Sequence, residues 1–272
     1  MDTNSSQHID PTPAVKSSFS WHRMLEIANF YRPSCQLQLL IYLGISLLLG
    51  VLIFLPAGGS VQTALFTLCW AIIPYMVYFG PCMLTRYGDA RIVERMMPVK
   101  ASERYVFFLL YFLIAVPLAA FLIPELCIWI YSKMPEVITE EMRMLSDMHL
   151  HQPLMLRMIN ILGCMATILT CLYTVQYARH NRLIKSIAAT FGTQIGLGIL
   201  GAFYGLAEVF KAGYKDGMEG KPACLDGDQI VSNLMQDLFN GSPFGYTVVS
   251  ILLIFTAVML YLNYRVIARR NL

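Results

Sequence analysis

The stretch RYGDARIVERMMPVKASER, residues 86–104, is a charged island between two apolar runs that are too long for a soluble core. The run before it, from Pro33 to Thr85, contains no Asp, Glu, Lys, Arg or His. About 20 apolar residues are enough for a helix to cross the roughly 30 Å hydrocarbon layer of a bilayer. The island therefore predicts a loop outside the membrane, joining two membrane-spanning helices.

Composition indicates the same class, because 57% of the residues are hydrophobic and only 14% are charged, whereas soluble domains carry about 25% charged residues. Within the first long run, the Pro and Gly residues at 56–60 predict a reversal of the chain. We predict an all-α polytopic membrane protein, with one transmembrane domain over residues 19–272. Its six predicted crossings are 36–55, 61–84, 105–131, 158–178, 186–210 and 244–264.

The distribution of Lys and Arg predicts the orientation. With six crossings both termini lie on one side, and that side holds 14 of the 20 Lys and Arg residues. Cytoplasmic flanks carry the excess of positive charge. Both termini and the island are therefore predicted to be cytoplasmic, in a bacterial inner membrane.

The first 18 residues are polar and punctuated by Pro, without the apolar core of a signal peptide. They predict a disordered cytoplasmic tail over 1–18. In the next segment, 19–31, Met24, Ile27 and Tyr31 recur at helical spacing. We predict a helix lying on the cytoplasmic membrane surface there. The alternative is that this segment is the lower end of the first crossing.

No catalytic motif is present: the chain lacks HExxH, GxSxG and GxxxxGK[ST], and no crossing contains paired carboxylates. We therefore expect no enzymatic activity, no cofactor and no nucleic-acid partner. Six cysteines lie in or beside apolar runs, where they act as small hydrophobic residues. Cys224 lies in an outer loop and is either free or paired with another molecule. His149 and His151 are weak evidence for a metal site, so none is predicted.

Glu125 and Glu208 are the charged residues inside the apolar runs, and both lie near the outer ends. Each could reach the outer interface by extending its side chain along the helix. Alternatively they line a translocation path, because acids inside a membrane often mark substrate or ion pathways. Thr193 and Gln194 add polarity to the fifth crossing and are candidates for the same path.

The fifth crossing also carries a stripe of glycines. Small residues at this spacing let another helix approach closely. The neighbour is a helix of the same chain, a helix of a second copy or the opposite wall of a pore. The predicted packing residues are Gly192, Gly196, Gly201 and Gly205.

The island itself has the pattern of a short amphipathic helix. Stepping about 100° per residue from Asp89 places Ile92, Val93, Met96 and Met97 on one arc, opposite the charged side chains. Pro98 ends the helix. Such a helix could transmit a push from a soluble partner, and the alternative is an ordinary solvated loop.

Residues 94–112, ERMMPVKASERYVFFLLYF, resemble the first cytoplasmic loop of type-two ABC exporter permeases, which has the form E-x-x-x-x-L-P-V-S-x-x-E/R followed by a crossing. The chain departs from that pattern in three places. Met97 stands where the family has Leu, and Lys100 to Ser102 stand where Ser-Arg is common. The outer segment before the last crossing shows one helical stripe where the family has a helical pair.

The resemblance implies the membrane subunit of an ATP-driven exporter, which dimerises with itself or a related subunit and hydrolyses nothing. The substrate is left open. The competing hypothesis is a membrane protein without transport activity, such as a scaffold, an assembly factor or an immunity protein. On the exporter hypothesis a separate ATPase would dock on Arg91, Glu94, Arg95, Met96, Met97 and Pro98.

Overall fold

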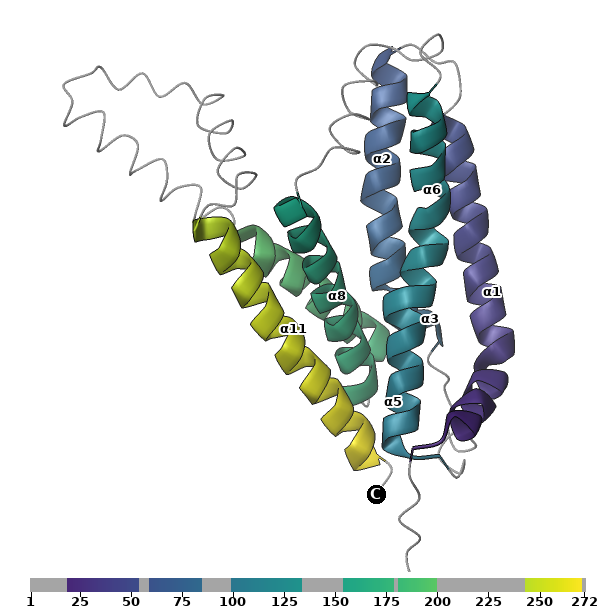
Figure 1. Cartoon of the computed structure of the whole chain (residues 1–272), viewed down its shortest axis with the longest axis vertical. Helices are drawn as coiled ribbons and strands as arrows, with labels where there is room; N and C mark the ends of the chain where they lie inside the picture. Colours follow the sequence, from purple (N-terminus) through teal and green to yellow (C-terminus); the bar gives the residue numbers. More distant parts are fainter. Residues whose placement is uncertain are drawn as a thin grey trace, which may run out of the picture.

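The structure is a computed structural model that describes residues 19–53, 59–84, 99–133, 154–178, 181–199 and 243–270. Every regular element in these ranges is helical, so the all-α prediction is confirmed for them (Figure 1). The predicted tail over 1–18 and the docking residues Arg91 to Pro98 lie outside the described residues. So do Gly201, Gly205, Glu208 and Cys224.

Four described helical spans are long and apolar enough to cross a membrane, as is typical of a multi-pass membrane protein. They are Trp21–Leu52, Ala101–Ile130, Leu154–Tyr177 and Gly245–Arg269. The second and fifth predicted crossings overlap the helices 59–78 and 182–199, which are not among the four. The count of six crossings therefore stays a prediction. The labelled elements are α1 (Trp21–Ile53), α2 (Gly59–Tyr78), α3 (Gly80–Leu84), α5 (Ala101–Leu110), η1 (Tyr111–Ala115), α6 (Val116–Ser132), α8 (Leu154–Tyr177) and α11 (Pro243–Arg270).

Residues 19–31 do not form a separate helix, because α1 runs without a break from Trp21 to Ile53. That this segment lies on the membrane surface stays a prediction. Pro33 lies inside α1 and removes one backbone donor, which favours a bend without ending the helix. Figure 1 shows the first turns of α1 bent away from the rest of its axis. Helix continuity agrees with the alternative, in which the segment is the lower end of the first crossing.

Two prolines shape the long helix formed by α5, η1 and α6. Pro117 cannot donate a backbone hydrogen bond, and the turn before it widens into a π-helical segment in which Val116 N donates to Tyr111 O. Pro124 likewise leaves the carbonyl of Ala120 without its usual partner four residues on. The Ser46 hydroxyl donates to that carbonyl at 2.8 Å. A side chain of α1 thus satisfies a polar group that a bilayer could not.

The boundary between α2 and α3 is Phe79, just before the Gly-Pro pair 80–81, and side chains of α1 satisfy the backbone there. Tyr42 Oη donates to Met76 O at 2.8 Å. Gln38 Nε2 donates to Gly80 O at 3.0 Å, and Tyr111 Oη donates to Gln38 Oε1 at 2.9 Å. Gln38, Tyr42 and Tyr111 are buried, so this polar cluster fixes α1 against the break.

The described helices form two groups. In the first, α1 packs along α6 and α2 lies beside both; in the second, α8 packs along α11. The groups meet where α5 contacts α11 and where α3, α2 and η1 contact α8. Tyr105 Oη of α5 donates to Leu260 O of α11 at 2.8 Å at this junction. Toward the other end, α8 and α11 lean away from α2 and α6 (Figure 1).

Close contact between α1 and α6 depends on Gly50, since a Cβ added there would lie 2.8 Å from Cys127 Sγ. We predict that Gly50→Ala lowers the free energy of unfolding by about 1–2 kcal/mol through overpacking, as measured by denaturant titration in mixed micelles. Adding Cys127→Ala should recover most of this loss. Gly44→Ala is the matched control, because nothing lies within 4 Å of its added Cβ. Equal effects at Gly44 and Gly50 would contradict this packing.

Candidate functional site

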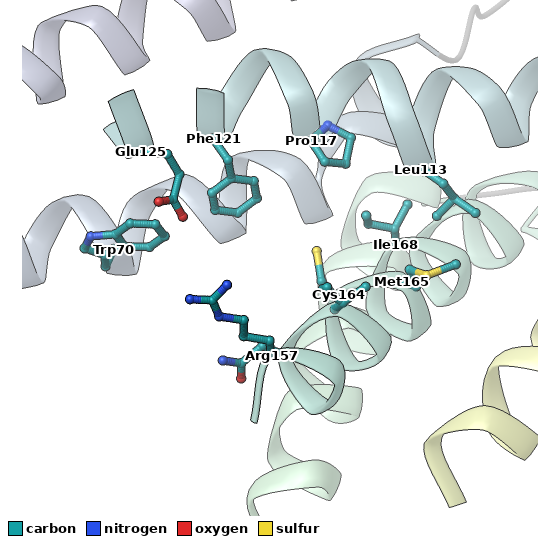
Figure 2. Close-up of a pocket in the computed structure, with 11 residues that line it drawn as sticks. Trp70, Leu113, Pro117, Phe121, Glu125, Arg157, Cys164, Met165 and Ile168 are labelled. Carbon is teal, nitrogen blue, oxygen red and sulfur yellow. The ribbon is translucent and has the colours of Figure 1, made fainter. Parts of the chain in front are cut away.

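A cavity of about 660 Å³ lies between the two helix groups, on the side where they diverge. Its walls come from α2, η1 and α6 on one side and from α8 on the other (Figure 2). Volumes of 300–1,000 Å³ are usual for sites that hold a small molecule. The lining residues are Trp70, Leu113, Pro117, Phe121, Glu125, Arg157, Asn160, Ile161, Cys164, Met165 and Ile168.

The cavity is polar at one end and apolar at the other. Leu113 and Glu125 are 12 residues apart on one continuous helix, which is about 18 Å at 1.5 Å per residue. In Figure 2, Glu125 and Arg157 lie at one end of the cavity, and Leu113 and Ile168 lie at the other. The two charged residues are exposed, whereas Ile168 is buried. The charged end is therefore the open mouth and the apolar end is the floor.

Three elements bring the side chains of the mouth together. Trp70 of α2 stacks on Phe121 of α6, with ring centroids 6.0 Å apart and planes 19° from parallel. Glu125 lies one turn further along α6, and Arg157 comes from the first turn of α8. The Glu125 carboxylate and the Arg157 guanidinium point into the same space from opposite walls (Figure 2). The mouth thus presents one acid, one base and an aromatic face.

The predicted path-lining residues are not all in one place. Glu125 lines this cavity. Thr193 Oγ1 donates to the backbone carbonyl of Ala189 in its own helix at 2.8 Å, and Gln194 Nε2 donates to Thr167 Oγ1 of α8 at 2.7 Å. Neither residue borders the cavity of Glu125. The prediction of a path lined by all of them stays untested, and the described residues place only Glu125 at this cavity.

The glycine stripe lines a different, apolar cavity of about 390 Å³ between the helix 182–199 and α11. Gly192 and Gly196 face this space together with Ile251 and Phe255. A Cβ added at either glycine would meet no heavy atom within 4 Å among the described residues. The predicted helix-packing role therefore has no close neighbour in the described part of the chain, and it stays a prediction.

A buried carboxylate lies at the opposite end of the first group. Glu103 has a side-chain exposure of 0%. Its Oε1 accepts hydrogen bonds from Ser20 N at 2.9 Å and from Arg23 Nη2 at 2.8 Å, and its Oε2 accepts one from Lys100 N at 3.0 Å. The carboxylate thus ties the start of α1 to the backbone that leaves the charged island. Charge-assisted bonds of this kind are the strongest hydrogen bonds in proteins.

Sequence reasoning missed several of these residues. Arg157 was placed just before a crossing at 158–178, whereas α8 begins at Leu154 and includes it. Glu103 lies in the charged island, where no local pattern predicts that it is buried. Both are charged residues at the edge of an apolar run, and that position was the signal that could have found them. Trp70 and Asn160 carry no local pattern that marks them as neighbours across helices.

Two cysteines and a serine bring α3, α8 and the helix 182–199 into contact. Cys82 Sγ lies 3.6 Å from Cys171 Sγ and 3.0 Å from Ser186 Oγ. The six cysteines in the described ranges are thiols and not disulfides. In the same ranges, no group of three or more His, Cys, Asp and Glu residues could hold a metal ion.

Comparison of the chain with family models, with curated proteins and with solved structures gives no match.

Proposed function

We propose that this chain is the membrane subunit of an ATP-driven exporter, coupled to a separate ATPase through the loop 86–104. The observation that carries the proposal is the cavity with Glu125 and Arg157 at its mouth, between two groups of apolar helices. Charged side chains within membrane segments are costly, and they mark pathways for substrates or ions when they face a cavity. A protein with only a scaffolding role needs no such cavity.

The arrangement of the helices would also allow one group to rotate against the other. The two groups meet through α5 with α11 and through α3, α2 and η1 with α8, and they lean apart toward one end (Figure 1). Rotation of one group against the other about this junction would widen or narrow the cavity. Many transporters alternate access by such rocking of one bundle against another.

Glu103 offers a mechanical connection between the loop and the cavity. It fixes Lys100, where the chain leaves the island, to Ser20 and Arg23 of the N-terminal helix. From Ala101 the chain continues as one helical segment through η1 to Ser132, and this segment carries Glu125. Displacement of the loop would move the α6 wall of the cavity, because a continuous helical segment joins Lys100 to that wall.

The test is mild purification of the protein from its native host, followed by identification of what accompanies it. We expect a soluble ATPase in stoichiometric amount, lost when Glu94→Arg and Arg95→Glu are combined. The matched control combines Arg265→Glu with Arg269→Glu, two exposed residues at the end of α11 on the same predicted side. Repeated purification without a nucleotide-binding partner would contradict the proposal, as would equal loss in the control.

A further inference from the structure

We infer that the cavity between α6 and α8 binds an amphiphile with a zwitterionic head group, its head at the mouth and its apolar chain along the floor. As a statement about the exported substrate, this inference rests on the proposed function. As a statement about binding, it rests on the cavity alone.

The shape and polarity of the cavity indicate an amphiphile. The polar mouth and the apolar floor are separated by about 18 Å along the α6 wall. Half-buried Pro117, Phe121, Cys164 and Met165 provide apolar contacts between the two ends, with Ile168 at the floor. An apolar chain lying there removes its own surface and theirs from contact with water or head groups. A fully polar solute would leave this floor uncovered.

The charge of the mouth indicates the head group. Its walls carry one carboxylate, Glu125, and one guanidinium, Arg157, so their formal charges cancel. A head with one anionic and one cationic group can face both side chains and leave no charge uncompensated. A singly charged head would be attracted by one wall and repelled by the other.

The individual side chains suit such a head. A guanidinium presents a planar set of donors that binds phosphate or carboxylate with two parallel hydrogen bonds. Glu125 would attract an ammonium group, and the exposed amide of Asn160 adds a polar contact. Trp70, stacked on Phe121, places an aromatic face near the mouth that can also attract a cation.

The test uses Trp70 as its own reporter. Trp21→Phe and Trp129→Phe leave Trp70 as the single tryptophan of the full chain. The protein is placed in nanodiscs with increasing fractions of phosphatidylcholine or phosphatidylglycerol that carry identical brominated chains, which quench nearby tryptophan. We expect half-maximal quenching at an about five-fold lower fraction of the zwitterionic lipid, since exposed ion pairs contribute up to about that factor.

Two controls separate binding from general contact with lipid. A variant with only Trp21, which is exposed at the start of α1, should show no dependence on head group. Glu125→Arg should shift the preference toward the anionic lipid, and combining it with Arg157→Glu should restore the preference for the zwitterionic one. A purely structural ion pair would also be restored by the swap, but it would not change which head group is preferred.

A second arm distinguishes the source of the ligand. A single-chain brominated phosphocholine is added from solution below its micelle concentration. Quenching by the bilayer lipid identifies a membrane phospholipid, and quenching by the single-chain compound alone identifies an amphiphile taken from solution. Equal quenching by the two bilayer lipids, together with no quenching by the single-chain compound, would overturn the inference. This assay needs no ATPase, so its failure leaves the co-purification test of the exporter untouched, and the reverse also holds.

Discussion

Replacing Glu103 with alanine is expected to lower the free energy of unfolding by about 3 kcal/mol. The substitution removes a carboxylate with no solvent exposure and leaves three donors without their acceptor: the backbone N–H groups of Ser20 and Lys100, and the guanidinium of Arg23. The Arg23 side chain is only 26% exposed, so water replaces the carboxylate poorly. Denaturant unfolding in mixed micelles measures the change.

Two further variants make this result specific. Glu103→Gln keeps an oxygen that can accept the bonds but loses the charge, and its effect should be about half as large. Glu26→Ala removes an exposed acid that lies 3.4 Å from His22 Nδ1 on the same helix, and it should change the free energy of unfolding by less than about 0.5 kcal/mol. If Glu103→Ala and Glu26→Ala behaved alike, the carboxylate would not hold the start of α1.

Tyr42→Ala is expected to lower the free energy of unfolding by about 3–5 kcal/mol, the usual range for removing a fully buried aromatic side chain. The lost ring packs in the core of the first helix group, and the lost hydroxyl donates to Met76 O beside the break between α2 and α3. Tyr42→Phe keeps the ring and removes this hydrogen bond together with the one that the hydroxyl accepts from Gln38 Nε2 at 3.1 Å. We expect it to lower the free energy of unfolding by about 1–2 kcal/mol.

The control for this series is Tyr261→Ala on α11, whose side chain is exposed. It should leave stability almost unchanged in the same unfolding measurement. A Tyr42→Phe protein as stable as the original would mean that the hydroxyl does not support the carbonyls at the break. In that case the polar cluster with Gln38 would not fix α1 against the break between α2 and α3.

The apolar runs predicted most of the helices, because length and lack of charge are properties of one segment at a time. Their ends were less accurate: α8 begins four residues before the predicted Met158, and α11 continues past Tyr264 to Arg270. Charged residues such as Arg157 and Arg265 end an apolar run without ending a helix. Pro33 was likewise compatible with a continuous α1, since proline can bend a helix that continues on both sides.

The candidate site was predicted in part. Glu125 was identified because an acid inside an apolar run is unusual. The residues that face it were not, since Trp70 and Arg157 belong to other helices, and sequence spacing within one helix carries no information about contacts between helices. Gly50 shows the same limit, because its close approach to Cys127 depends on how α1 crosses α6.

The most direct test of the account is the side of the membrane on which the cavity opens. Asn160→Cys places a thiol at its mouth, and Trp21→Cys places one at the start of α1, both in a chain with Cys224→Ser. We predict that a membrane-impermeant thiol reagent labels Asn160→Cys in intact cells and labels Trp21→Cys only after permeabilisation. The reverse pattern would contradict both the predicted orientation and an exporter whose cavity faces away from the charged loop.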